Sequence, residues 1–370
     1  MKESSEQQYI ITFNAGSSTI KFALFNNADL SCEFHKQIDL SPNHSNLTDL
    51  INQIGLELKN YNIIAAGHRV VHGGKEFADL IRITPEILNK LKALIPLAPL
   101  HQPYNVQVIQ ACLKLYPNIT QIACFDTAFH RSRGKLEQIF ALPDKYRQEG
   151  IIPYGFHGLS YQYIASILPE YAKSKAKGKV IVAHLGNGAS ICAMKGLQSM
   201  ATSMGFTALD GLMMGTRCGS LDPGVILYLL EEKKMTVNEV KELLYHQSGL
   251  KAVSNISHDI RTLLQSSEEK AQEAIELFCY KAAKHIAGLI PTINGLEAIV
   301  FTAGIGENSP VIREKICQYL SWLGITIDIQ SNKNNKTKIS TNNSKIEVYV
   351  LKTDEEKIIA KQTKSLLKAT

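Results

Sequence analysis

Stretches of apolar and polar positions divide the chain into strand-like and helix-like segments. An apolar run from Tyr9 to Phe13 is followed by a Gly/Ser-rich turn and a second strand-like run from Ile20 to Phe25. This pattern predicts a hairpin with a polar tip. The same pattern returns about half the chain later, where the runs Val180 to Ala183 and Ile191 to Met194 flank the turn LGNGAS. The two hairpins indicate that the chain is internally duplicated.

Longer segments with apolar residues at helical spacing alternate with further apolar runs. A third strand, Ala298 to Thr302, leads into AGIGENSP and an amphipathic helix from about Val311 to Leu323. Other helices are predicted over 84–94, 105–115, 160–168 and 268–289. Alternating strands and helices predict an α/β fold. The Asn-, Lys- and Ser-rich segment 331–344 predicts a solvated loop or hairpin with no chemistry of its own.

Length, charge and cysteine use narrow the class of protein. A chain of 370 residues exceeds the size of one hydrophobic core, which predicts two domains. The formal net charge is only +6 and the lysines are dispersed, so nucleic-acid binding is not implied. No signal-peptide or membrane-spanning apolar run is found, so a cytoplasmic protein without a membrane partner is expected. The seven cysteines contain no CxxC pair, which favours buried thiols over a disulfide framework or zinc site.

The turn of the first hairpin, NAGSSTIK, combines small residues, hydroxyls and a lysine. Backbone amides in such a turn converge on an anionic oxygen, and hydroxyls and a lysine add donors and charge. The candidates to face a phosphate or a metal-bound water are Asn14, Ser17, Ser18 and Thr19. Lys21 lies on the same face of the returning strand as Thr19. The alternative is an ordinary hairpin with a surface lysine, and the spacing does not match a Walker loop.

Two later turns extend this phosphate-binding pattern. In HLGNGAS, Gly186 and Gly188 permit close backbone approach, while Asn187 and Ser190 supply polar tips. His184 precedes this turn, and its position is equally compatible with a structural role and with a ligand contact. The third turn, AGIGEN, lacks the third glycine of the dinucleotide fingerprint, which disfavours a dehydrogenase.

Charged residues and a histidine supply the remaining candidates. Arg69 in GHRVVHGG could clamp a carboxylate or phosphate, with a surface ion pair as the alternative. Arg217 in MGTRCGSLDPG has few obvious partners, which favours a functional role. His157 in PYGFHGLSY follows an aromatic residue and is flanked by glycines, a setting that lets the imidazole reach a ligand. Asp126 and Glu355 end strand-like runs, where carboxylates meet the ligand crevice of α/β sheets and hold Mg²⁺. The alternative for both is a helix N-cap or first-turn acid.

With these motifs the sequence resembles the acetate kinases, which belong to the acetate and sugar kinase, Hsp70 and actin superfamily. The resemblance runs in order from Tyr9 to the C-terminal helix through NAGSSTIK, GHRVVHGG, PLAPLHQP, FDTAFH, YGFHGLSY, HLGNGAS, TSMGFTALDGLMMGTRCGSLDPG, HDIR, FTAGIGEN and TDEE. It implies two ribonuclease-H-like (actin-like ATPase) domains with a catalytic cleft between them. We expect residues 1–128 plus 355–370 to form the first domain and 129–354 the nucleotide-binding second domain.

The resemblance also implies a role for each candidate. Asp126, His157 and Arg217 would be catalytic, with His157 and Arg217 stabilising the transferring phosphoryl group. Arg69 would bind the substrate carboxylate, beside an apolar acyl pocket of Val71, Leu100 and Phe156. Asn14 and Glu355 would bind Mg²⁺, with Mn²⁺ as an alternative. ATP or ADP would contact Lys21, His184, Leu185, Gly186, Asn187, Gly188, Asp259, Ile260, Arg261, Gly304, Ile305, Gly306, Glu307 and Asn308.

The implied activity is reversible phosphoryl transfer between ATP and acetate, giving acetyl phosphate and ADP, and the implied assembly is a homodimer. From the duplicated α/β halves we also expect the two domains to close during turnover. Acetate is ionised at neutral pH and needs no general base, so we expect Asp126 to orient charge rather than accept a proton. Ala208 stands where the family usually has proline, which keeps a propionate or butyrate kinase as the alternative. A non-catalytic actin- or Hsp70-like switch would not need Arg69, His157 and Arg217.

Overall fold

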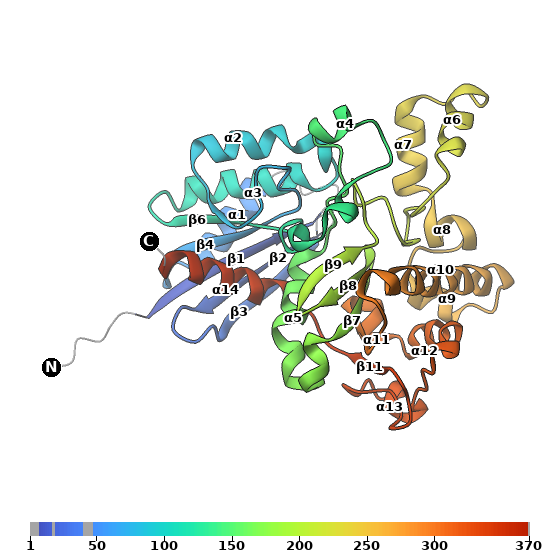
Figure 1. The fold of residues 1–370 in the computed structure, drawn as a ribbon. Helices are drawn as coiled ribbons and strands as arrows, with labels where there is room; N and C mark the ends of the chain where they lie inside the picture. Colours follow the sequence, from blue (N-terminus) through green and yellow to red (C-terminus); the bar gives the residue numbers. More distant parts are fainter. Residues whose placement is uncertain (1–6, 17–18, 40–46, 369–370) are drawn as a thin grey trace. The chain divides into compact units, whose positions relative to one another are not determined.

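The computed structural model describes residues 7–16, 19–39 and 47–368, drawn in Figure 1. By their internal contacts the residues fall into two compact units. Unit 1 comprises Met1–Arg131, Gly158–Tyr163 and Asp354–Thr370, and unit 2 comprises Ser132–His157 and Ile164–Thr353. The segment 158–163, which the sequence-based division gave to the second domain, is grouped with unit 1.

Unit 1 is built on a six-stranded sheet with the order β3-β2-β1-β4-β6-β5. The first hairpin is present, because β1 pairs antiparallel with β2 and β2 pairs antiparallel with β3. β4 is parallel to both β1 and β6. The strands are β1 (Gln8–Ala15), β2 (Thr19–Asn26), β3 (Cys32–Asp39), β4 (Asn62–Val70), β5 (Ile81–Arg82) and β6 (Thr120–Phe125).

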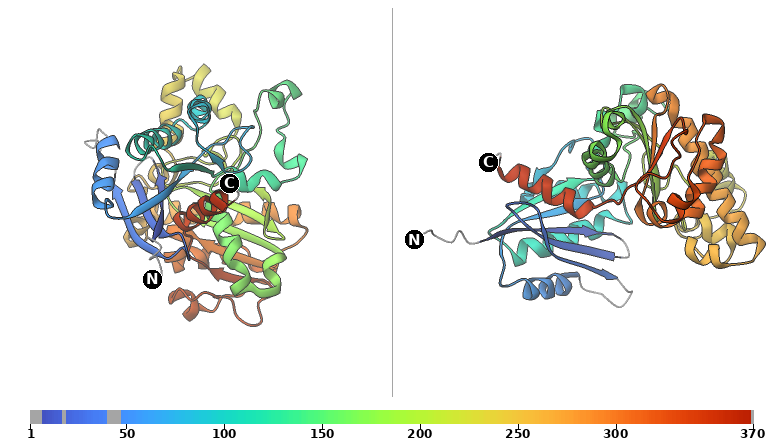
Figure 2. Two further views of the ribbon diagram at one scale, coloured as in Figure 1. Left: turned by 90° about the vertical axis from the view of Figure 1, so that its left-hand side faces the viewer. Right: turned by 90° about the horizontal axis from the view of Figure 1, so that it is seen from below.

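Both faces of this sheet are covered at β1, whose residues after Gln8 are all buried. Ile11 and Phe13 pack in a core cluster with residues of α1 (Leu47–Glu57) and α3 (Gln102–Leu115). Ile10 points to the opposite face and packs with Ala360 of α14 (Glu355–Lys368), which lies along this face in Figure 2. A strand buried on both faces reads as a continuous apolar run rather than an alternating one.

Unit 2 repeats the same strand order on a five-stranded sheet, β11-β10-β7-β8-β9. β7, β8 and β9 are antiparallel, and β10 is parallel to β7 and β11. This matches β1, β2, β3, β4 and β6 in unit 1, so the internal duplication predicted from the two hairpins is confirmed. The strands are β7 (Lys179–Leu185), β8 (Ala189–Lys195), β9 (Gln198–Thr202), β10 (Ala298–Thr302) and β11 (Glu347–Val350).

Helices complete the α/β architecture. The helices predicted over 84–94, 105–115, 160–168 and 268–289 are present as α2, α3, α5 and α10, and α10 packs against β7, β8 and β9. The other helices, beyond those already given, are α2 (Pro85–Ala93), α4 (Asp144–Gln148), α5 (Gly158–Ala172), α6 (Pro223–Glu231), α7 (Val237–His246), α8 (Gly249–Ser254), α9 (Ile260–Gln265), α10 (Glu269–Ile293), α11 (Ala303–Asn308), α12 (Pro310–Tyr319) and α13 (Ile329–Lys333).

Three local predictions need correction. AGIGEN is the short helix α11 rather than a loop, and the amphipathic helix that follows spans only α12, Pro310–Tyr319. Segment 331–344 is not simply solvated, since Asn332 and Ile339 are fully buried. Asn332 was expected to be exposed because it is polar. Its side chain can be buried because its Oδ1 accepts a hydrogen bond from Arg313. Within the described residues no helix is long and apolar enough to cross a lipid bilayer.

Candidate active site

In unit 1 the predicted charged residues meet where parallel strands end. β1, β4 and β6 run in the same direction, and their last residues bring Asn14, Arg69 and Asp126 to one edge of the sheet. The carboxyl ends of parallel strands are the usual ligand side of an α/β sheet. Residues that are far apart in the sequence thus form one polar cluster.

Arg69 and Asp126 form the centre of this cluster. Arg69 donates from Nε at 3.0 Å and from Nη2 at 2.7 Å, and both bonds reach the same oxygen, Asp126 Oδ2. The Arg69 side chain is 15% exposed and that of Asp126 is 1% exposed. Oδ1 of Asp126 is buried and has no hydrogen-bond partner among the described residues. One oxygen of this buried carboxylate is therefore a hydrogen-bond acceptor that the described residues leave unused.

Asn14 links Arg69 to the start of α14. Its Oδ1 accepts from Arg69 Nη1 at 3.0 Å. Its Nδ2 donates to Glu355 Oε2 at 2.9 Å and to Glu356 Oε1 at 2.8 Å. Glu356 is a member of the cluster that sequence reasoning missed; the doubled acid of TDEE was the available signal. The cluster thus contains three carboxylates and one guanidinium.

Burial sets the electrostatics of this cluster. It raises the pKa of Asp126 to about 6, although the charge and hydrogen bonds of Arg69 act in the opposite direction. Burial also raises the pKa of Glu356, and the neighbouring charge of Glu355 adds to this shift. Burial works against the charge of Arg69, yet the carboxylates of Asp126 and Glu355 outweigh it and raise its pKa. Arg69 therefore stays charged, while the clustered acids carry a cost that a cation would relieve.

Lys21 belongs to the same unit. It faces Asn14 in the register of β1 and β2, and its charge partly offsets the raised pKa of Glu356. Thr19 begins β2 at the other end of the turn. Ser17 and Ser18, the other predicted phosphate-facing residues, lie outside the described residues.

In unit 2, His157, His184 and Arg217 gather around the second glycine turn. The rings of His157 and His184 stack with centroids 4.2 Å apart, and His157 Nδ1 lies 2.8 Å from Ser190 Oγ. A Cβ added to Gly188 would lie 3.0 Å from His157 Nε2 and 3.9 Å from Arg217 Nη1. Glycine at 188 therefore leaves room for both side chains.

Two local features fix these side chains. His157 has a left-handed backbone with φ of 58° immediately before α5, a strained conformation for a residue with a side chain. Arg217 donates from Nη1 to the carbonyl oxygen of Ala208 at 3.0 Å. Strained backbone at a non-glycine residue is often kept where a side chain must be aimed, and here the imidazole is aimed at Gly188.

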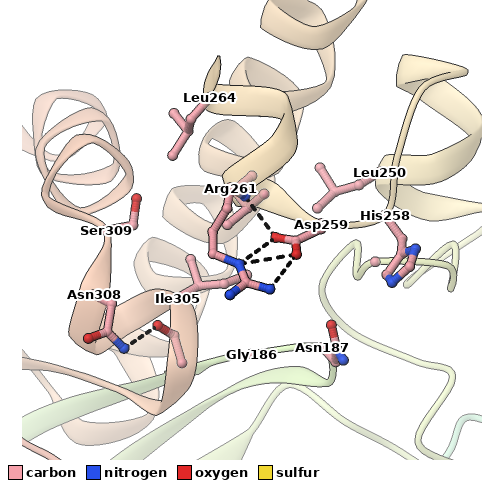
Figure 3. A pocket seen from close by; sticks show the side chains of 13 residues that line it. Gly186, Asn187, Leu250, His258, Asp259, Arg261, Leu264, Ile305, Asn308 and Ser309 are labelled. Atoms are coloured by element: carbon pink, nitrogen blue, oxygen red, sulfur yellow. Dashed lines mark hydrogen bonds and ion pairs between the residues drawn. The ribbon is translucent and has the colours of Figure 1, made fainter. Parts of the chain in front are cut away.

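Unit 2 also contains a cavity of about 540 Å³. Three segments predicted to bind nucleotide meet in it: Gly186 and Asn187, Asp259 to Arg261, and α11 with the residue that follows (Figure 3). Its lining is Gly186, Asn187, Gly215, Leu250, His258, Asp259, Ile260, Arg261, Leu264, Gly304, Ile305, Asn308 and Ser309. Sequence reasoning assigned no role to Gly215, Leu250, His258, Leu264 and Ser309, although Gly215 and His258 lie within quoted motifs and Ser309 adjoins one.

Local hydrogen bonds shape the walls of this cavity. Asp259 caps α9 by accepting from Arg261 N at 2.9 Å, and its carboxylate also binds the Arg261 side chain, as Figure 3 shows. On the other wall Asn308 Nδ2 donates to Gly304 O at 2.9 Å. Glu307 turns inward, where its Oε1 accepts from Ala303 N at 2.8 Å and Thr353 N at 3.0 Å. These bonds lie within each wall, and apolar Ile260 and Ile305 also line the cavity.

The residues predicted for the acyl pocket are divided between the two units. Val71 and Leu100 belong to unit 1, and Phe156 and Ala208 belong to unit 2. Val71 and Phe156 are buried, and Leu100 is half-buried. Among the described residues no group of three His, Cys, Asp or Glu side chains is arranged as a metal site.

These features define a class: a nucleotide-binding protein with two duplicated α/β domains. A model of the acetokinase family matches residues 33–361, and the chain belongs to this family. It is 46% identical over 384 aligned residues to an acetate kinase of Rhodopseudomonas palustris, covering 95% of this chain and 96% of that one. It is 44% identical to an acetate kinase of Rickettsia prowazekii, covering 97% and 99%.

Solved structures agree with this assignment. A propionate kinase of Francisella tularensis has a TM-score of 0.90 at 36% identity, covering 97% of this chain and 99% of that chain. An acetate kinase of Porphyromonas gingivalis has a TM-score of 0.86 at 34% identity, covering 97% and 100%. The two units are therefore actin-like ATPase domains, and the protein is a phosphotransferase whose acceptor is a carboxyl group.

Proposed function

We propose that the protein transfers the γ-phosphoryl group of ATP to acetate, reversibly, forming acetyl phosphate and ADP. The observation that supports this best is the meeting of three predicted nucleotide-binding segments in one cavity. Membership of the acetokinase family supports a carboxylate as the acceptor. The cluster of Arg69, Asp126 and Asn14 supplies a fixed cation that suits such an anion.

Each residue set has a distinct task in this proposal. Arg69 binds the acetate carboxylate, and its hydrogen bonds to Asp126 and Asn14 fix the plane of the guanidinium before substrate arrives. Arg217 and His157 stabilise charge on the equatorial oxygens of the transferring phosphoryl group. The carboxylate of acetate is already ionised at neutral pH, so no proton has to be removed before attack. Asp126 then acts by orienting Arg69 rather than as a base.

Magnesium fits the cluster in unit 1. Mg²⁺ prefers oxygen ligands, and Asp126 Oδ1 is a buried oxygen without a hydrogen-bond partner among the described residues. Asn14 and Glu355 are the side chains that would hold the ion, directly or through water, and they already lie together, since Asn14 Nδ2 donates to Glu355 Oε2 at 2.9 Å. When bound, the ion would neutralise charge on the phosphate oxygens. Mn²⁺ would suit the same oxygen donors.

Propionate is the second candidate substrate. The propionate kinase of Francisella tularensis is a close structural relative, and this chain has alanine at position 208, where the resemblance to the acetate kinases implies proline. A hydroxamate assay with MgATP and acetate, propionate or butyrate tests both candidates. The highest kcat/KM with acetate supports the proposal; the highest with propionate replaces it with propionate kinase. Absence of any acyl phosphate refutes both and favours a nucleotide switch.

A homodimer is part of the proposal, and α6 is its expected contact. The helix sequence PGVILYLLE is almost entirely apolar, yet none of its residues is buried. Leu227 is 56% exposed and Tyr228 is 52% exposed. An apolar helix that is exposed in one chain is explained if a second copy of the chain packs against it.

A Leu227→Glu variant should sediment as a monomer in analytical ultracentrifugation, whereas Leu56→Glu, at an exposed leucine of unit 1, should not. A wild-type monomer would refute the dimer.

A cytoplasmic location is also proposed. All seven cysteines are unpaired thiols, five of them buried, which is the state expected in a reducing compartment.

A further inference from the structure

Arg313 of α12 is the largest fully buried side chain of the described residues, and it lies outside every predicted motif. All five of its N–H donors are used. Nε donates to Asn332 Oδ1 at 2.8 Å, and Nη2 donates to Asn332 O at 2.8 Å and Asn335 Oδ1 at 2.6 Å. Nη1 donates to Gly306 O at 2.9 Å and to Glu307 O at 3.0 Å. One guanidinium thus joins α11, α12 and the segment around α13.

The acceptors of Arg313 are all neutral amide oxygens. Among the described residues no carboxylate lies within ion-pair distance of it. Burial lowers the pKa of Arg313 to about 10, so the side chain still carries its charge at neutral pH. A buried charge without a counter-ion is costly and persists only where hydrogen bonds compensate it fully. If this position served only to fill the core, an apolar side chain would do so without the free-energy cost of burying a charge.

The two carbonyls that Arg313 holds belong to a wall of the nucleotide cavity. Gly306 and Glu307 lie in the last turn of α11, whose carbonyls have no partners further along the helix. Gly304, Ile305 and Asn308 of the same helix line the cavity, while Arg313 itself does not. Ser309, the next lining residue, accepts from Arg313 N at 3.2 Å. The guanidinium therefore supports the wall from behind.

We propose that Arg313, with Asn332 and Asn335, is a positioning residue that sets nucleotide affinity by fixing α11 against the cavity. This deepens the proposed function and rests on it. The planar guanidinium is what the arrangement requires, because lysine has no fork to hold two carbonyls of α11 and two groups of Asn332 at once. The Asn-rich segment 331–344 thereby contributes indirectly to the nucleotide site.

Binding of ADP to the full-length protein, measured by titration calorimetry, tests the inference without relying on turnover. Arg313→Lys should weaken ADP binding by about tenfold, because several of its hydrogen bonds cannot be remade. Asn335→Gly keeps the left-handed backbone of Asn335, whose φ is 49°, and should weaken ADP binding by about threefold through loss of one bond. The KM for acetate should change by less than about twofold in both.

Ile316→Ala is the matched control, since Ile316 is fully buried on the same helix and has no bond to α11. It should lower the melting temperature as much as Arg313→Lys but leave ADP affinity unchanged. If Arg313→Lys lowers the melting temperature and keeps wild-type ADP affinity, Arg313 is only structural and the inference is wrong. If ADP affinity and the KM for acetate worsen equally, the positioning role is also refuted. Failure of the wild-type protein to bind ADP would overturn the proposed function itself.

Discussion

Arg69 directs two of its N–H groups at a single oxygen of Asp126, Oδ2, with distances of 3.0 and 2.7 Å. A side-by-side ion pair would use both carboxylate oxygens, whereas this one leaves Oδ1 unused and buried. The third contact of the guanidinium is Asn14 Oδ1, which in turn is tied to Glu355 and Glu356. The arrangement fixes the arginine on one side and leaves a carboxylate oxygen on the other.

Arg69→Lys should therefore damage acetate use even though the charge is kept. Lysine cannot donate to Asp126 and Asn14 while also presenting a planar pair of N–H groups to a carboxylate. We expect kcat/KM for acetate to fall by about 100-fold or more, while ADP affinity remains near wild type. Steady-state hydroxamate kinetics and ADP titration measure the two effects. Arg82→Lys, at an exposed arginine, is the control; equal loss in both variants would contradict the assignment.

Asp126 should leave a signature in the pH dependence of stability. Burial raises its pKa from 3.8 to about 6, so between these values the folded protein holds a proton that the unfolded chain has released. Holding this proton adds to the free energy of unfolding at pH values near 4, and this contribution is lost as pH rises toward 6. The free energy of unfolding of wild type minus that of Asp126→Asn should thus fall by up to about 3 kcal/mol from pH 4 to 6.5.

Urea denaturation at a series of pH values makes this measurement. Asp144→Asn is the opposite control, because hydrogen bonds from Arg147 lower the pKa of the exposed Asp144. Asp144→Asn should therefore remove a contribution to the free energy of unfolding that grows as the pH rises. If Asp126 behaves like Asp144, the ion pair with Arg69 outweighs burial and the pKa of Asp126 is lowered instead.

The sequence was most informative where residue type alone implies geometry. The two hairpins, and with them the internal duplication, were predicted from apolar runs around Gly/Ser turns, because two such runs flanking a short turn usually pair as strands. The three segments that meet in the nucleotide cavity were recognisable from their glycines and from the family resemblance. Each of these motifs is defined by residue types within a few positions of one another, so it can be recognised from the sequence alone.

Long-range burial was not readable in the same way. Asn332 and Arg313 look like surface residues, since polar and charged side chains are usually exposed. They can be buried because hydrogen bonds satisfy both side chains, including one between them across 19 positions. Glu356 was missed for a related reason: its partner Asn14 lies 342 positions away. Single-sequence reasoning has no access to such pairs.

Gly188→Ala should separate turnover from nucleotide binding. The added methyl would lie 3.0 Å from His157 Nε2, closer than ordinary contact, and would push the imidazole from its place beside His184. We expect kcat to fall by about tenfold or more with a smaller change in ADP affinity. Gly288→Ala is the control, because nothing lies within 4 Å of a Cβ at that position. Unchanged kcat in Gly188→Ala would mean that the ring of His157 needs no fixed position.

Arg217→Ala gives the most direct test of phosphoryl-group stabilisation. Arg217 Nη1 is held by Ala208 O at 3.0 Å and lies 3.9 Å from a Cβ built at Gly188, beside His157. A fixed cation at this place lowers the barrier only when charge develops during transfer, so its loss should lower kcat and kcat/KM together. We expect a loss of 100- to about 1000-fold, with KM for ATP little changed. Arg217→Lys should recover part of kcat because it restores charge without the fork. A rise in KM with normal kcat would instead make Arg217 a binding residue.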